Sequence, residues 1–170
     1  TVYDYAHIGN FRAYIFSDLL RRYLEFLGHE VKLVMNLTDV DDKTIKGAQK
    51  ENVPLSKFTQ RYEKAFFEDL DALRIKRATV HPRATEHINE MMDIISILLK
   101  KKIAYIGEDG SVYYKISKFK TYGKLSRLKL KSLKAGARVS QDNYTKDEAQ
   151  DFALWKAWTP EDGDVAWHAG

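Results

Sequence analysis

The sequence predicts an α/β fold that opens with a strand, a helix and a second strand, and three observations predict it. Residues 11–27 carry apolar side chains at helical spacing, and Gly28 follows them where a helix commonly ends. Residues 31–35 (VKLVM) form a short apolar run that is typical of a buried parallel strand. The chain also starts with a short apolar stretch that we interpret as the end of a strand. Because open α/β sheets bind ligands beyond the carboxyl ends of their strands, we expect functional residues there.

Helical periodicity defines the next elements in chain order. We expect Thr38 or Asp39 to cap a helix that runs to about Lys50. Two longer helices are predicted at roughly residues 55–73 and at residues 85–102, and a short strand near 78–80 has weaker support. The apolar stripe of the helix at 11–27 consists of Phe16, Leu20, Leu24 and Leu27, broadened by Ile15, Leu19 and Tyr23. The stripe of the helix at 55–73 consists of Phe58, Tyr62, Phe66, Leu70 and Leu73. In the helix at 85–102, the residues expected to face inward are Ile88, Met91, Ile95, Leu98 and Leu99.

The character of the chain changes near residues 102–104, and we place a domain boundary there, between residues 1–102 and residues 103–170. Residues 103–106 and 111–116 read as a β-hairpin, because Asp109-Gly110 between them is a strong turn pair. Near the end lie three aromatic residues that either stack on nucleic-acid bases or belong to a core, and their irregular spacing favours the core: Phe152, Trp155 and Trp158.

Composition excludes several classes of protein. No apolar run approaches the 18 residues that a membrane-spanning helix needs, and no signal peptide is visible. The chain has no cysteine, and its five histidines form neither an H-x3-H pair nor an HExxH motif, so we expect no metal site within it. Because the chain begins with Thr inside an expected strand, we interpret it as a piece of a longer protein.

Positive charge is concentrated in one block of the chain. The net charge is only +4, but residues 100–138 contain twelve Lys and Arg residues against Glu108 and Asp109. Such a block either follows a phosphate backbone or forms an ordinary solvated lysine face, and charge alone does not favour one over the other.

The first ten residues, TVYDYAHIGN, predict an anion-binding site. A strand delivers His7 and Gly9 to the N-terminus of a helix, where the helix dipole and unpaired N–H groups favour negative charge. The glycine lets a flat group approach the backbone, and the imidazole adds a hydrogen-bond donor. The alternative interpretation is a loop histidine in front of an ordinary helix.

Three segments together resemble a known family. His7-Ile8-Gly9-Asn10 is similar to the His-Ile-Gly-His signature of class I aminoacyl-tRNA synthetases. Residues 36–43 (NLTDVDDK) and 82–88 (PRATEHI) extend the resemblance to cysteinyl-tRNA synthetases, in the same order over nearly the whole chain. The resemblance implies the first half of a Rossmann-like class I synthetase nucleotide-binding domain in residues 1–102. It implies the start of a small α+β connective insertion, a β-hairpin plus a basic segment, in residues 103–170.

The resemblance also implies the residues of the site. His7 and Asn10 become the catalytic pair that stabilises charge on the ATP phosphates, with Asn10 replacing the second histidine of the general signature. The ATP and adenylate pocket comprises Thr1, His7, Gly9, Asn10, Asn36 and Thr38. Ala13 stands where many relatives carry a hydroxyl. From the residues alone Thr38 is equally well a helix N-cap, and we interpret Asp39, Asp41 and Asp42 as first-turn carboxylates rather than a magnesium cluster.

The implied activity is that of a cytoplasmic cysteine–tRNA ligase without a membrane association. ATP with Mg²⁺ and L-cysteine form cysteinyl-adenylate, and the cysteinyl group passes to tRNA(Cys). A Zn²⁺ ion that distinguishes cysteine from serine is expected in the full-length protein, with ligands outside this chain. The basic segment is expected to contact tRNA, first through Lys129, Lys131 and Lys134.

Three other interpretations stay open beside this one. A cysteine ligase of mycothiol synthesis shares the fold, and the basic insertion and Lys43 favour the tRNA enzyme over it. A non-catalytic RNA-binding relative keeps the fold, but it has no need of His7, Gly9 and Thr38. The isolated chain is also expected to be inactive without the rest of its protein.

Overall fold

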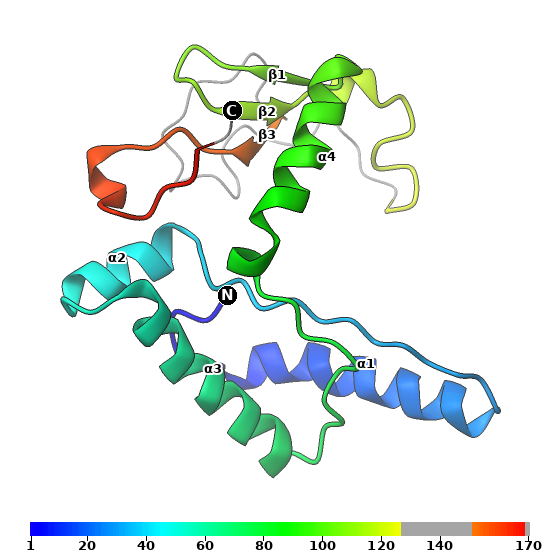
Figure 1. The fold of residues 1–170 in the computed structure, drawn as a ribbon. Coiled ribbons are helices and arrows are strands. Elements are labelled where there is room, and N and C mark those ends of the chain that lie inside the picture. The colour runs from blue at the N-terminus through cyan, green and yellow to red at the C-terminus, as the bar shows by residue number, and fades with distance from the viewer. Residues whose placement is uncertain (127–150, 169–170) are drawn as a thin grey trace. The chain divides into compact units, whose positions relative to one another are not determined.

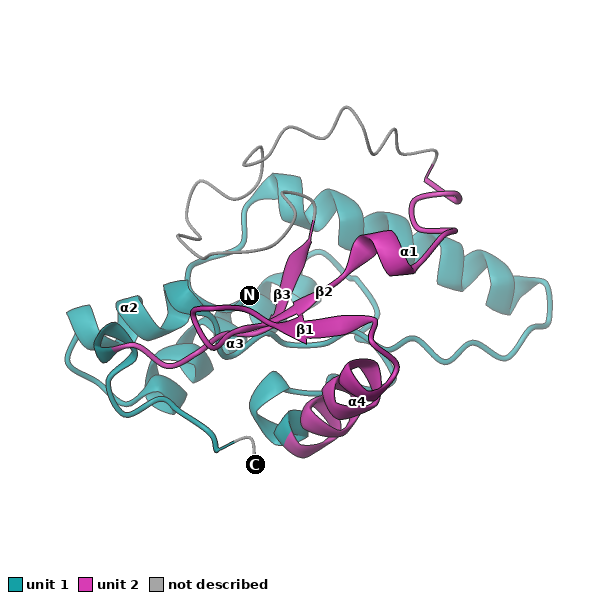
Figure 2. Cartoon of the chain, turned by 90° about the horizontal axis from the view of Figure 1, so that it is seen from above, with its two compact units in different colours: residues 1–88, 160–168 teal, residues 89–159, 169–170 magenta. Residues whose placement is uncertain are grey.

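The computed structural model describes residues 1–126 and 151–168, which form two compact units (Figures 1 and 2). Unit 1 comprises Thr1–Ile88 and Pro160–His168, and unit 2 comprises the described residues of Asn89–Thr159. The architecture combines helices with a small antiparallel sheet. The compact units therefore divide at the start of a helix, before the boundary expected near residues 102–104, and the assignment of domains at that boundary stays a prediction.

Unit 1 is built around three helices, each of which was predicted: α1 (Ile8–Phe26), α2 (Asp42–Lys50) and α3 (Leu55–Ala72). Two short 3-10 helices, η1 (Ala84–His87) and η4 (Pro160–Asp162), belong to the same unit. Gln49 of α2 donates a hydrogen bond to the carbonyl of Glu161 at 2.8 Å, which ties the late segment to the early one. The buried core of unit 1 gathers side chains from the start of the chain, α1, the extended segment before α2, α3 and the segment after α3: Val2, Phe11, Leu37, Phe66, Leu70 and Ile75.

The cap of α2 differs from the prediction. The helix begins at Asp42, and Asp41 is its N-cap, because the Asp41 carboxylate accepts the Thr44 N–H at 2.8 Å. The Thr44 hydroxyl accepts the Asp41 N–H in return, also at 2.8 Å. Thr38 and Asp39 therefore lie outside the helix. Several residues of the segment qualify as caps by type, and only the backbone geometry chooses among them.

Extended segments replace the parallel strands that we expected near the start of the chain, at 31–35 and at 78–80. In the described residues they form two isolated parallel bridges, Val34↔Val80 and Leu37↔Arg83, rather than a continuous ladder. The N–H of Val2 donates to the carbonyl of Thr38 at 3.2 Å on the other side of the central segment. Three extended segments thus run side by side. Residues 33–37 and 79–84 share five backbone hydrogen bonds, but their pattern gives isolated bridges rather than a regular ladder.

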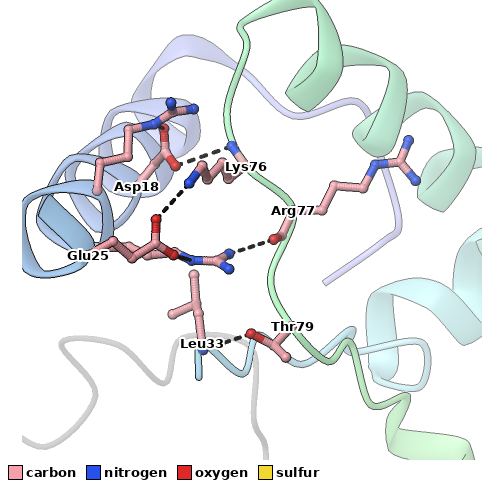
Figure 3. Close-up of polar contacts among 8 residues, drawn as sticks. Asp18, Glu25, Leu33, Lys76, Arg77 and Thr79 are labelled. Carbon is pink, nitrogen blue, oxygen red and sulfur yellow. Dashed lines mark hydrogen bonds and ion pairs between the residues drawn. The ribbon is translucent and has the colours of Figure 1, made fainter. Parts of the chain in front are cut away.

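The orientation of α1 is the reverse of what its apolar stripe indicates. Near its start, Phe11 and Tyr14 of α1 pack in the core of unit 1. Beyond them the face that packs against the rest of the unit is polar: Asp18 is buried and accepts the backbone N–H of Lys76 at 3.2 Å, and Glu25 accepts the Lys76 ammonium at 2.6 Å (Figure 3). Arg21 donates to the carbonyl of Arg77 at 2.8 Å. The opposite face exposes most of the predicted stripe and its neighbours: Ile8, Ile15, Phe16, Leu19, Leu20, Tyr23, Phe26 and Leu27.

Unit 2 contains α4 (Ile88–Lys100), which starts in unit 1, and a three-stranded antiparallel sheet in the order β1-β2-β3. The strands β1 (Ala104–Ile106) and β2 (Val112–Tyr114) confirm the predicted hairpin, and β3 (Phe152–Trp155) was not predicted. Buried Asp151 fixes the sheet by accepting the Ile116 N–H at 2.9 Å and the Tyr105 hydroxyl at 3.1 Å.

The helix predicted at 85–102 is divided into η1 and α4, and Met91, expected inward, is exposed.

Among the described residues, no helix combines the length and the apolar character that crossing a membrane requires.

Candidate nucleotide pocket

One pocket in unit 1 collects most of the residues that the sequence singled out. It has a volume of about 310 Å³ and lies between the start of the chain, the first turn of α1, the extended segment at 35–38 and α3. Five of the six predicted pocket residues line it: Thr1, His7, Asn10, Asn36 and Thr38. They come from two parts of the sequence that the Val2–Thr38 backbone hydrogen bond holds together.

His7 is the N-cap of α1, and Asn10 in the first turn completes a capping box with it. The Nδ1 atom of His7 accepts the Gly9 N–H at 3.0 Å, and the side-chain oxygen of Asn10 accepts the His7 N–H at 3.0 Å. Because Nδ1 is the acceptor, the neutral imidazole carries its proton on Nε2, which is thereby a hydrogen-bond donor. The capping contact of His7 is therefore compatible with a role in the pocket, and Asn10 keeps its amide N–H groups for other partners.

Gly9, the sixth predicted residue, does not line the pocket but lies beneath the His7 ring. A Cβ atom at this position would stand 2.8 Å from Cε1 and 3.0 Å from Nδ1 of His7. Such contacts are too short for a side chain to be added without moving the imidazole. Glycine at position 9 therefore permits the ring position that caps the helix.

Asn36 and Thr38 lie on the wall opposite α1. The Asn36 side-chain amide donates to the Thr38 hydroxyl at 3.1 Å, so this hydroxyl keeps its own proton for another acceptor. Thr38 does not cap α2, as the fold shows, and the capping interpretation of this residue is wrong.

The three aspartates that follow are engaged in structural contacts. Buried Asp39 accepts the backbone N–H of Thr85 at 3.0 Å and the Thr85 hydroxyl at 2.6 Å, which joins the second family-like segment to the third. Asp41 caps α2, and Asp42 lies in its first turn. Within residues 1–126 and 151–168, no group of three or more His, Asp or Glu side chains is placed to hold a metal ion. The interpretation of these aspartates as carboxylates that serve the helix agrees with Asp41 and Asp42, while Asp39 has a different partner.

His81 supports the pocket wall, and sequence reasoning missed it. Its Nδ1 lies 3.1 Å from the carbonyl oxygen of Met35, a pocket residue, and its Nε2 accepts the Ala78 N–H at 3.2 Å. The ring packs edge-on against Phe67, with 4.9 Å between centroids. Burial lowers the pKa of His81, so the neutral form that accepts from Ala78 is favoured. A lone histidine before a proline gives no sequence signal of this role.

The third family-like segment, residues 82–88, does not line the pocket but contacts the elements that do. Arg83 forms a two-pronged ion pair with Glu63 of α3, a carboxylate that is largely buried, and also pairs with Glu86 at 3.2 Å. The hydrogen bonds from Arg83 to Glu63 raise the pKa of Arg83 further above its usual value, so the guanidinium stays charged. His87, in the same segment, is half-buried in η1.

One cation lies beside the residues at the start of the pocket. The Lys43 ammonium lies 4.6 Å from the centroid of the Tyr3 ring and 3.4 Å from its hydroxyl, and Tyr3 lines the pocket.

The predicted RNA contacts Lys129, Lys131 and Lys134 lie outside the described residues. The described part of the basic block belongs to unit 2.

Comparison with known proteins gives a consistent result. The whole chain, residues 1–170, matches the family model of the catalytic domain of class I (C) tRNA synthetases. It is 55% identical over 170 residues to a cysteine–tRNA ligase of Chlamydia pneumoniae, covering 99% of this chain and 36% of the relative. It is 59% identical over 169 residues to a cysteine–tRNA ligase of Brachyspira hyodysenteriae, covering 98% and 35%. The chain thus spans about a third of the length of these curated relatives.

Proposed function

Because this chain belongs to the family of class I tRNA synthetase catalytic domains, we propose that the natural protein is a cysteine–tRNA ligase. It activates L-cysteine with ATP to cysteinyl-adenylate, and it then transfers the cysteinyl group to tRNA(Cys). The relatives that the chain resembles at 55% and 59% identity carry this name. A cytoplasmic location fits the same family.

The observation that carries the proposal is the shared pocket of Thr1, His7, Asn10, Asn36 and Thr38. Adenylate formation needs groups that neutralise charge on the α-phosphate while the cysteine carboxylate attacks it and pyrophosphate leaves. His7 offers its Nε2–H, and the N-terminus of α1 adds the positive end of a helix dipole. The hydroxyl of Thr38, still able to donate, suits an adenylate oxygen. No covalent enzyme intermediate is required, so these residues orient groups and stabilise charge.

The same proposal includes the finer architecture. The parallel bridges between segments 34–37 and 80–83 are consistent with part of a Rossmann-like sheet in the first half of the nucleotide-binding domain. Residues 103–170 then begin the connective insertion, whose hairpin is β1 and β2. The basic residues 100–138, including Lys129, Lys131 and Lys134, contact the acceptor end of the tRNA.

The proposed reaction involves two metal ions, Mg²⁺ and Zn²⁺, and we assign no ligands for either ion to this chain. ATP is used with Mg²⁺, and Asp39 and Asp41 are already bonded to Thr85 and Thr44. The chain has no cysteine, and its described residues gather no metal-binding cluster, so they do not fit the Zn²⁺ that selects a thiolate. We assign the ligands of that ion to residues outside this chain and derive no step through it.

The test is ATP–pyrophosphate exchange by the natural protein in its full length. Exchange is expected with L-cysteine and to be far weaker with L-serine. Equal exchange with serine, or none with cysteine, contradicts the proposal. Product analysis with tRNA(Cys) and with an amino sugar as alternative acceptors separates the tRNA ligase from the mycothiol-type ligase, and RNA binding without exchange identifies a non-catalytic relative.

A further inference from the structure

The small sheet of unit 2 has two unlike faces. Tyr113 points to one face and is fully buried there beside Tyr105, at 5.7 Å between ring centroids. The next residue, Tyr114, turns to the other face, as the alternation of a strand requires. It lies opposite Phe152 of β3, and the two rings are stacked with centroids 5.0 Å apart and planes 13° apart. Tyr113 is therefore the deeply buried ring of this pair, whereas Tyr114 is only half-buried.

Two further rings extend the second face. Tyr122 lies 6.4 Å from both Tyr114 and Phe152, and Phe119 lies 6.5 Å from Tyr122. We call these four residues the aromatic surface: Phe119 and Phe152 are 46% and 38% exposed, and Tyr114 and Tyr122 are half-buried. A cluster that served only as a core would hide these rings more completely.

Cations alternate with the rings along the chain. The run Lys118-Phe119-Lys120-Thr121-Tyr122-Gly123-Lys124 places an exposed lysine on either side of each ring, and residues 116–126 contain no acidic residue. This combination is what a single-stranded nucleic acid needs, since flat rings stack on bases while ammonium groups pair with the phosphates between them.

We propose that the aromatic surface binds unpaired nucleotides of an RNA, with Phe119 and Tyr122 stacking on bases and Lys118, Lys120 and Lys124 contacting the phosphates. The proposal deepens the proposed function and rests on it for the choice of RNA as the partner. It also revises the sequence-based preference for a core role of Phe152, whose ring stacks on Tyr114. Stacking tolerates any base, so the surface is expected to recognise that nucleotides are unpaired rather than their sequence.

The test measures binding of a stem-loop RNA with an unpaired 3′ overhang, and of the same stem with a blunt end, to the natural full-length protein. Tyr122→Leu removes the ring face but keeps an apolar side chain, and it is expected to weaken overhang binding about 5- to 100-fold. Blunt-stem binding is expected to stay within twofold, and Tyr122→Phe to retain the wild-type affinity. Phe26→Leu, at an exposed ring of unit 1, is the matched control and should change neither affinity.

A second measurement needs no variant. A 2-aminopurine placed in the overhang is expected to lose fluorescence on binding, because stacking on a ring quenches it. Undiminished fluorescence at every overhang position, or equal losses with blunt and overhanging RNA in Tyr122→Leu, overturns the proposal. Cysteine-dependent pyrophosphate exchange is measured in the same samples. Its absence from the wild type defeats the proposed function, whereas intact exchange without overhang preference defeats only the aromatic surface.

Discussion

The pocket of unit 1 and the aromatic surface of unit 2 are built in opposite ways. The polar groups around the pocket are held by specific hydrogen bonds, such as those of His7 with Gly9, Asp39 with Thr85, and His81 with Met35, at 2.6–3.1 Å. The aromatic surface consists of rings 5.0–6.5 Å apart beside exposed lysines. The pocket therefore depends on single atoms, whereas the surface depends on a sum of similar contacts. Changes in the pocket should therefore be large and insensitive to salt, and changes on the surface should be small, additive and sensitive to salt.

The largest effect is expected from His7→Ala in the full-length protein. Loss of one preorganised donor to a charged transition state typically costs ~3–4 kcal/mol, so cysteine-dependent pyrophosphate exchange should fall by roughly a hundredfold or more. His29→Ala, an exposed histidine beyond the end of α1, serves as the control and should leave exchange unchanged. A fall of less than threefold in His7→Ala returns His7 to a purely structural role.

Gly9→Ala tests whether the position of the His7 ring matters for exchange, because it moves the ring without removing it. The new Cβ would stand 2.8 Å from Cε1 of His7, and a displacement of about 1 Å in a reacting site can cost up to ~100-fold, so we expect a loss of about 10- to 100-fold. Alanine also raises helix propensity by ~1 kcal/mol at most. Lower exchange with unchanged or higher thermal stability therefore identifies ring displacement, and wild-type exchange would show that the ring position is unimportant.

Asp39→Ala tests whether the pocket depends on the link between its segments. The Thr85 N–H and hydroxyl lose their acceptor, which should lower the free energy of unfolding by ~1–3 kcal/mol in urea titrations. The loss should be the same at low and high salt. Asp42→Ala, in the first turn of α2, is the comparison and should cost less, ~0.3–1 kcal/mol, and that loss should shrink with salt. Equal losses in the two variants would contradict the assigned role of Asp39.

His81 gives a smaller, pH-dependent effect. Burial lowers its folded pKa, so the unfolded chain binds more protons near pH 6, and stability increases with pH there. This contribution is complete above the ordinary histidine pKa of about 6.5 and declines as the pH falls through that value. The Arg77 and Arg83 charges nearby add to the lowering, and Glu63 opposes it. Urea midpoints of His81→Gln between pH 5 and 8 should vary less than those of the wild type, and an unchanged pH profile would exclude this role.

The smallest effect per residue belongs to the basic segment. Replacing Lys129, Lys131 and Lys134 by Gln should flatten the salt dependence of tRNA binding, by ~0.7–0.9 units of log–log slope for each lysine–phosphate pair that the substitutions remove. Adenylate formation should survive, because the pocket residues are untouched. Lys57→Gln on α3 is the single-lysine control, and an unaltered slope in the triple variant would mean that this block is an ordinary solvated face.

The sequence predicted elements well where local signals agree. The spacing of apolar residues predicted α3, and Asp109-Gly110 predicted the hairpin of β1 and β2. Five pocket residues were identified through motifs, and the structure brings them together. Their roles, like the domain boundary, stay predictions.

Long-range contacts decide the features that local sequence patterns do not reveal. The buried face of α1 is chosen by the Asp18–Lys76 and Arg21–Arg77 contacts, which no helical periodicity shows. The strand β3 depends on pairing with β2, and the irregular spacing of its aromatic residues indicated a core role without predicting a strand. The partner of Asp39 lies in η1, far along the chain, so the sequence alone offered capping as the nearest use for a carboxylate.

The outer face of α1 has a practical consequence for the behaviour of this chain in solution. Phe16 and Phe26 are 68% and 84% exposed, and six more large apolar residues share that face. A contiguous apolar area of this kind attracts other molecules at high concentration, and a net charge of only +4 provides little repulsion to oppose it. Self-association through the outer face of α1, rather than unfolding, should therefore limit the solubility of the 170-residue chain. Charged substitutions at positions 16 and 26 should raise the concentration at which the chain precipitates without changing its unfolding midpoint.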